Sequence, residues 1–233
     1  MAKNGIEKKI DNGGALAVAG AADFFSAPTV ANAGVEDRMI PALHLYQGTS
    51  KEADQFGPGF AMGDLLDAVE KRKTASRNIA VIKGVKRWKR WNDGEKAPVY
   101  DYDDRSKVPP EDLEWTGEGE SRKPPLATET FEFMVLIEGE AFPYVARFKR
   151  TGYKAGQLLF ELCERAKAKK RIAKVGFGVS KGEGAQGGYA AAEIRDAGNA
   201  SDEMVRDVIQ WFGRLNTQPV KVQGESGGDD IPI

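Results

Sequence analysis

Five cations and two indole rings alternate within residues 79–91, and these are the residue types that bind unpaired nucleic acid. The stretch starts with apolar, mostly β-branched residues and contains no acidic residue before Asp93. Cations neutralise phosphates, and an indole ring that stacks on a base contributes about 1 to 3 kcal/mol. A duplex hides the faces of its bases, so this combination favours a single strand. The cations are Lys83, Lys86, Arg87, Lys89 and Arg90, and the indoles are Trp88 and Trp91.

A second basic segment follows further along the chain, and we expect it to line the same groove. It comprises Arg147, Phe148, Lys149, Arg150 and Tyr153. Alternation along a strand places Trp88 and Trp91 on opposite faces unless a bulge intervenes, and we favour Trp88 as the stacking residue. By the same alternation Phe148 is a candidate core residue, with its two neighbours pointing outward.

The alternative interpretation of both segments is structural. Tryptophan and arginine also form cation–π pairs on ordinary protein surfaces, and a tryptophan near the end of a strand is often buried in a core.

Composition allows one main domain with a locally charged surface. The chain has 233 residues, 41% of them hydrophobic, and a formal net charge of −1. It is therefore no uniform polycation, and any site for a polyanion depends on segregated charge. Segments 71–90 and 147–174 are basic, whereas 93–120 is mostly acidic.

Single copies of cysteine and histidine limit the chemistry that the chain can perform. Cys163 has no partner for an intramolecular disulfide, and His44 has no second histidine with which to bind a metal. Both are predicted to be structural, Cys163 in a helix and His44 in a strand. We expect no cofactor, no metal and no catalytic activity.

Hydropathy predicts a protein of the cytoplasm. No stretch reaches the roughly 20 apolar residues that a membrane-spanning helix needs. The alanine-rich segment 15–22 is short and flanked by acidic residues, which argues against a secretory signal.

The order of predicted elements indicates the fold. We expect a flexible arm at 1–35, a domain at 36–216 and a disordered acidic tail at 217–233. Within the domain, residues 92–130 form a long loop with at most one short strand, and 63–69 form either a helical turn or a strand. The predicted strands are 40–47, 79–91, 131–137, 142–150, 172–179 and 189–195, and the predicted helices are 153–170 and 201–212.

This order matches that of an OB-fold. The class is mainly β with α (α+β): a five-stranded barrel with a helix between its third and fourth strands, here with a C-terminal helix appended. Such barrels bind oligonucleotides on one face and in the loops beside it.

The last residues suggest a binding tip. A polar, glycine-bearing segment ends in Asp229, Asp230, Ile231, Pro232 and Ile233. An acidic segment with an apolar tip can be held in a basic, apolar pocket of a partner, and it can compete with nucleic acid for a cationic face. The tip resembles the C-terminal tail of bacterial single-stranded DNA-binding proteins, with Ile233 in place of the usual phenylalanine.

The chain as a whole is also similar to phage-encoded single-stranded DNA-binding proteins. The similarity involves residues 41–49, 79–91, 131–164 and the tail. It implies a protein of the host cytoplasm that coats single-stranded DNA during replication, recombination and repair. Its tail would recruit a polymerase, helicase, nuclease or recombinase, and homo-oligomerisation is left open. The cysteine-bearing insertion of some phage relatives is missing here, so no zinc is expected.

Other functions stay open from the sequence. Residues 182–187 fit the dinucleotide pattern G-x-G-x-x-G, but their context favours a hairpin loop, in which Lys181 and the exposed backbone are candidates for contact with phosphates. One alternative is a protein-interaction adaptor or virion component. Another is an RNA-binding or strand-annealing protein of the same fold.

Overall fold

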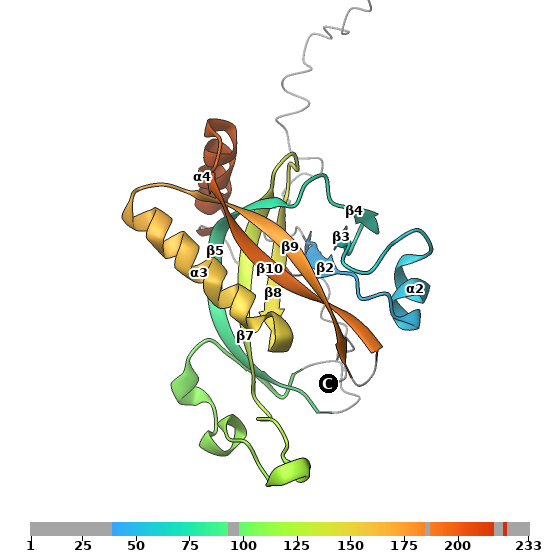
Figure 1. Ribbon diagram of the computed structural model, residues 1–233. Helices are drawn as coiled ribbons and strands as arrows, with labels where there is room; N and C mark the ends of the chain where they lie inside the picture. Colours follow the sequence, from blue (N-terminus) through green and yellow to red (C-terminus); the bar gives the residue numbers. More distant parts are fainter. Residues whose placement is uncertain (1–38, 93–97, 185–186, 217–220, 223–233) are drawn as a thin grey trace, which may run out of the picture. The chain divides into compact units, whose positions relative to one another are not determined.

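The chain is a mixed α/β protein built on a strongly curled sheet (Figure 1). The computed structural model describes residues 39–92, 98–184, 187–216 and 221–222. The predicted arm and the predicted binding tip, 229–233, lie outside the described residues.

Between residues 78 and 216, the described long strands and α-helices follow the order that the sequence predicts, whereas β11 lies in the segment 217–233 that was predicted to be disordered. The strands are β1 (Met39–Ile40), β2 (Ala42–Leu45), β3 (Leu65–Asp67), β4 (Arg72–Lys73), β5 (Asn78–Arg90), β6 (Tyr100–Tyr102), β7 (Thr128–Ile137), β8 (Pro143–Lys149), β9 (Ala173–Gly184), β10 (Gly187–Asn199) and β11 (Lys221–Val222). The α-helices are α2 (Ser50–Phe56), α3 (Tyr153–Ala168) and α4 (Asp202–Asn216).

Nine of the described strands form one sheet. The order along it is β10-β9-β5-β7-β8-β2-β3-β4, and β6 pairs with the far end of β5. Strands β5, β7 and β8 form an antiparallel meander, β9 pairs with the start of β5, and β2 joins β8 in parallel. Separately, β1 pairs in parallel with β11.

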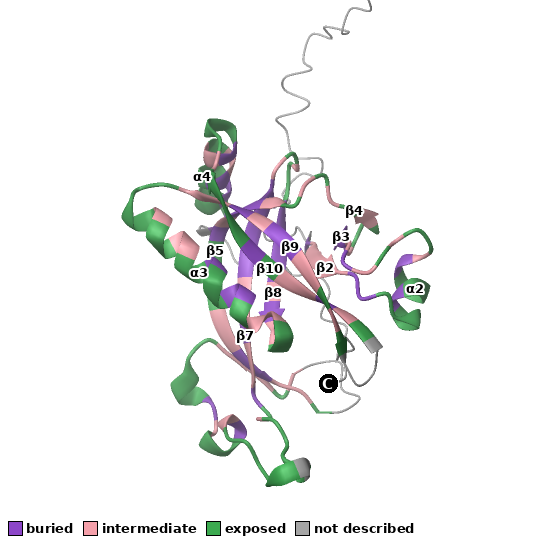
Figure 2. Ribbon diagram, viewed as in Figure 1, coloured by how far each residue is buried: buried purple, intermediate pink, exposed green. Residues whose placement is uncertain are grey.

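Both faces of the central strands are apolar along part of their length. One face packs against α3 through a cluster that includes Phe133, Phe148 and Leu159. The opposite face packs against α4 through a cluster that includes Met134, Val208 and Trp211. Figure 2 shows the buried residues concentrated on the strands and on the inner sides of these helices.

Helix α3 can approach the sheet closely because Gly156 faces it. A Cβ atom at this position would lie 2.7 Å from the Cβ of Phe148 and 3.1 Å from that of Phe131. The helical spacing of Leu159, Leu162 and Cys163 predicted this packing face, and all three belong to or adjoin the cluster.

The region before β5 contains a helix that the sequence analysis missed. Thr49 and Glu52 form a capping box at the start of α2, in which each side chain bonds the other's backbone N–H. Because α2 has only seven residues, it shows no extended apolar periodicity. The leucines of 63–69, left open between a helical turn and a strand, form β3.

The long connection between β5 and β7 has more structure than predicted. Beyond the one short strand, β6, its described part contains the 3₁₀ helices Arg105–Lys107, Pro110–Leu113 and Gly119–Ser121. Most of its residues are exposed (Figure 2), but Val108, Asp112 and Ala127 are buried.

The described residues of the glycine pattern, His44 and Cys163 all lie within strands or helices of the fold. Gly182 and Gly184 belong to β9 and Gly187 to β10, so the glycine pattern lies in an antiparallel hairpin, but its described residues are paired in the strands and do not form the predicted loop; residues 185–186 are not described. His44 stacks on Phe56 in the α2 region, and the Cys163 thiol lies half-buried in α3. Burial raises the pKa of this thiol to about 11.

Candidate nucleic-acid interface

Five of the predicted cations lie on one side of the β5–β7–β8 meander. They lie on the side of the sheet that α4 covers at the other end of these strands. We call the surface that they form the strand face; its residues are Lys83, Arg87, Lys89, Arg147 and Lys149. A register shift between Val81 and Lys83 sets which residues of β5 reach this face. After this shift, Arg87 of β5 and Lys149 of β8 lie on either side of Thr130 of β7. The two outer strands of the meander, β5 and β8, therefore carry the cations.

Two carboxylates partly neutralise the strand face. Glu132 of β7 lies 3.1 Å from Lys89 Nζ, and it accepts a hydrogen bond of 3.1 Å from Arg147 Nε. Asp101 of β6 lies 3.2 Å from Lys89 Nζ and accepts a hydrogen bond of 3.2 Å from Arg87 Nη1. Lys89 is only 7% exposed and pairs with both of these carboxylates, so it is a poor candidate for contact with phosphate.

The guanidinium of Arg87 lies close to both carboxylates of the strand face. Burial disfavours its charged form, but Asp101 and Glu132 outweigh that effect and raise the pKa of its guanidinium. Its buried Nε lies 3.2 Å from Glu132 Oε2 without forming a hydrogen bond within the described part of the chain.

Lys86 points to the opposite side of β5. Its Nζ lies 5.1 to 5.5 Å from the ring centroids of Trp88, Phe131 and Tyr153, and 3.1 Å from Glu129 Oε2. Burial opposes the charge, but hydrogen bonds with Tyr153 and Glu129 raise the pKa of Lys86. Lys86 and Tyr153 therefore tie β5 and β7 to the start of α3, and they are separated from the strand face.

The prediction that Trp88 stacks on bases is wrong for this structure. Trp88 is 6% exposed, and it packs with Val108 and Ala127 beneath the connection, next to Tyr100 and Tyr102. The connection covers this part of β5 because its apolar residues fold back onto the sheet.

Phe148 is likewise a core residue and not part of an interface. It is 2% exposed and lies among Phe133 and Phe177. Its neighbours Arg147 and Lys149 point outward, as the alternation predicted.

Arg90 holds the connection in place. Its Nη1 donates to both carboxylate oxygens of Asp112, at 3.1 and 3.0 Å, and Tyr100 donates to the same carboxylate at 2.8 Å. Asp112 is only 1% exposed, so Arg90 neutralises a buried charge and is a poor candidate for contact with phosphate.

The remaining predicted residues keep some accessible surface. Trp91 is half-exposed immediately after β5, and strand alternation continued by one residue puts it on the side of Arg87 and Lys89. Arg150 is exposed in the 3₁₀ turn Arg150–Gly152 between β8 and α3.

Sequence reasoning missed the acidic partners of the cations and one exposed cation–π pair. Glu129 and Glu132 are visible in the sequence of β7, but the strand pairing that places them beside β5 is not. In the connection, Trp115 is 55% exposed, and the guanidinium of Arg122 lies 4.6 Å from its ring centroid.

The described residues show neither a metal cluster nor a membrane-spanning helix. They contain no group of three or more histidine, cysteine or carboxylate side chains arranged to hold a metal ion. Within the same ranges, none of the helices has the length and apolar character needed to cross a membrane.

Comparisons with known proteins give no relative. No family model matches the sequence, and no match is found among curated proteins or among solved structures.

Proposed function

We propose that this protein binds single-stranded nucleic acid, preferentially DNA, across the strand face. The observation that carries the proposal is the gathering of Lys83, Arg87, Arg147 and Lys149 on one side of a three-stranded meander. Phosphates along a flexible single strand can follow such a row of cations, and salt weakens this binding.

The strand pairing supports an OB-type barrel. Strands β5, β7, β8, β9 and β10 follow the order of its five strands, α3 lies between the third and the fourth, and β5 pairs with both β7 and β9. In place of a direct pairing of the third strand with the fifth, β2 lies beside β8, and Gln47 bonds to Ala190 of β10. In OB-folds the meander face and the adjacent loops bind oligonucleotides.

The base-stacking part of the proposal is reassigned to Trp91. It has accessible surface beside the cations, whereas Trp88 is buried. In the cell, such a protein would coat single-stranded DNA during replication, recombination and repair, and residues 229–233 would recruit partner enzymes.

The test is a titration of labelled oligo-dT with the full chain, followed by fluorescence anisotropy at low and high salt. We expect binding that weakens as salt rises, tighter for oligo-dT than for duplex of the same length. Asp101→Asn should tighten binding because it removes a carboxylate that pairs with Arg87 and Lys89. Asp54→Asn on α2 should leave the affinity unchanged. Absence of binding at low salt would overturn the proposal.

A protein-interaction adaptor is the second candidate. Phe142, Ile209 and Phe212 are exposed on or near α4, and exposed apolar surface often marks a protein contact. This candidate predicts a stable complex on pull-down that Phe212→Ser removes, with no affinity for oligonucleotides. RNA binding and strand annealing are distinguished from DNA coating by oligo-U titration and by following the pairing of complementary strands.

A further inference from the structure

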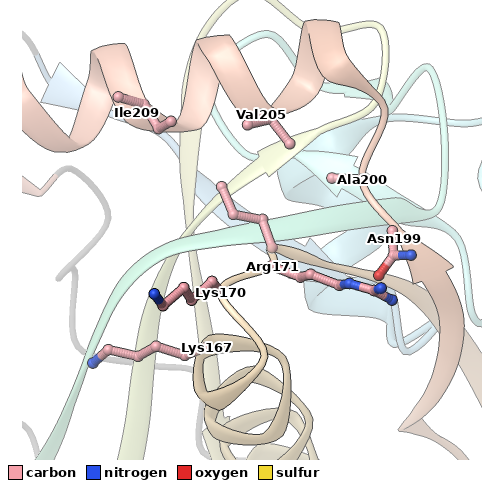
Figure 3. A pocket seen from close by; sticks show the side chains of 8 residues that line it. Lys167, Lys170, Arg171, Asn199, Ala200, Val205 and Ile209 are labelled. Atoms are coloured by element: carbon pink, nitrogen blue, oxygen red, sulfur yellow. The ribbon is translucent and has the colours of Figure 1, made fainter.

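A cavity of about 550 Å³ lies between the end of α3 and one side of α4 (Figure 3), and none of its lining residues belongs to the strand face. Its polar side is formed by Lys167, Lys170 and Arg171, and its apolar side by Ile172, Val205 and Ile209. Figure 3 shows Val205 and Ile209 on α4 opposite the two lysines. The volume lies within the range of about 300 to 1,000 Å³ that is typical of ligand sites.

The charge of this cavity is largely uncompensated. Lys170 and Arg171 are exposed, and no ion pair joins either of them to a carboxylate in the described residues. Lys167 lies 3.9 Å from Glu164, at the limit of an ion pair. The end of a helix also carries partial negative charge, which these cations complement without being neutralised.

The apolar side is unusually exposed. Ile209 is 61% exposed although it belongs to a helix whose opposite side packs against the sheet. A ligand that suits the cavity therefore has negative charge and branched aliphatic groups close together.

We propose that residues Asp229–Ile233 of the same chain dock in this cavity. Asp229 and Asp230 supply the two negative charges for Lys170 and Arg171, and Ile231 and Ile233 supply aliphatic side chains for Val205 and Ile209. An extended segment with an acidic part and an apolar part is suited to a site with the complementary division.

The path of the chain permits this docking. Val222 of β11 pairs with Ile40 of β1, and Ile40 belongs to the same apolar cluster as Met204 and Val208 of α4. Six residues, 223–228, separate Val222 from Asp229, so the seven steps between these two residues span at most about 25 Å when extended. Met204 and Val208 adjoin Val205 and Ile209, which line the cavity, and the whole of α4, with 15 residues, is about 22 Å long. A segment that starts beside Ile40 is therefore long enough to reach the turns of α4 that line the cavity.

The test compares amide chemical shifts of the full chain with those of Asp229→Asn/Asp230→Asn. Apart from residues next to the substitutions, we expect shift changes at 167–172 and 199–209. These changes should disappear when the same pair of substitutions is made in a Lys170→Glu/Arg171→Glu background. In a Lys51→Glu/Lys154→Glu background, which changes two charges elsewhere, they should persist.

Replacing an apolar residue with a polar one tests the apolar side of the cavity. Ile209→Ser should reduce the shift changes, whereas Phe212→Ser, at an exposed position of α4 that does not line the cavity, should leave them. Both positions are exposed, so neither variant is expected to unfold the protein, and the amide spectrum itself verifies folding.

Four outcomes would overturn the proposal. One is the absence of any shift change, and a second is a change located at Lys83, Arg87 and Lys149. A third is a change that depends on protein concentration together with a doubled molar mass, which would identify a second copy as the source of the segment. The fourth is an effect of oligo-dT on the cavity with none from Asp229 and Asp230. Because the cavity and the strand face lie at different positions, this test is independent of oligonucleotide affinity.

Discussion

Trp88 donates its indole N–H to Oε1 of Glu129 across the β5–β7 pair, at 3.1 Å. The two residues are directly opposite in the register, so the bond fixes the ring against the sheet. The connection then packs over the ring. Burial raises the pKa of Glu129, but hydrogen bonds from Tyr153, Lys86 and Trp88 outweigh this effect and lower it. The carboxylate is therefore ionised and well placed to hold the ring.

Replacing Trp88 should reduce stability. Trp88→Ala removes a buried ring, so we expect the free energy of unfolding to fall by about 3 to 5 kcal/mol in urea titrations. Trp115→Ala, at an exposed position of the connection, should change it by less than about 0.5 kcal/mol. Unchanged stability in Trp88→Ala would show that the ring is not packed as described.

Removing the buried carboxylate of the connection should loosen it locally. Asp112→Ala leaves Arg90 and Tyr100 without their shared acceptor, which should cost about 1 to 3 kcal/mol. Limited proteolysis should then cut residues 98–127 faster than in the wild type. Glu111→Ala, at the neighbouring exposed position, is the control and should keep the wild-type rate.

Neutralising the strand face should lower the salt dependence of oligonucleotide binding. In Lys83→Gln/Lys149→Gln, the slope of log affinity against log salt should decrease by about 1.4, or about 0.7 for each phosphate that the protein no longer neutralises. Lys51→Gln on α2 should leave the slope unchanged. Equal slopes in the double variant and the wild type would place the phosphates elsewhere.

Two helical glycines should respond to alanine with opposite signs. Gly156→Ala places a Cβ 2.7 Å from Phe148 Cβ, and such overpacking should reduce the free energy of unfolding by about 1 to 3 kcal/mol. At Gly213 of α4 a Cβ meets no atom within 4 Å. Gly213→Ala should therefore stabilise the protein by up to about 1 kcal/mol through helix propensity. Thermal or urea unfolding of both variants gives the comparison.

Glu52 should contribute stability that depends on pH. Burial raises the pKa of this carboxyl, but hydrogen bonds from His44, Thr49 and Gln47 outweigh it and hold the pKa below its ordinary value of 4.5. The contribution is thus fully present above pH 4.5 and is lost as the pH falls through the lower folded-state pKa. Glu52→Gln should cost about 2 kcal/mol at neutral pH, and less in acid. Urea unfolding across pH, with Asp54→Asn as the control, measures this difference.

Local patterns predicted the long strands and the α-helices between residues 78 and 216. The β-branched start of β5, the alternation of Phe131 and Phe133 in β7, and the 3.6-residue spacing of Leu159 and Leu162 in α3 depend only on neighbouring residues. For that reason they could be identified without knowledge of the fold. The short strands β1, β3 and β4 carry too few residues for a period to emerge.

The ion-pair partners of the β5 cations, and the burial of Trp88 between them, depend on residues that are distant in the sequence. Arg87 and Lys89 meet Asp101 because β6 returns along β5, and they meet Glu132 because of the β5–β7 register. Trp88 is covered because Val108 and Ala127 fold back from the connection. A strand pattern shows which residues alternate, but it does not show which face another segment covers.

The bond between Gln47 and Ala190 has a consequence for how the sheet can move. The side-chain amide donates to the Ala190 carbonyl at 3.0 Å and accepts from its N–H at 2.8 Å, so one side chain takes the place of a strand neighbour. A pair of bonds made by a rotatable side chain opens at lower cost than a ladder of backbone bonds. Widening of the curled sheet should therefore begin at this join between β2 and β10, and the interior on the α3 side would be exposed there first.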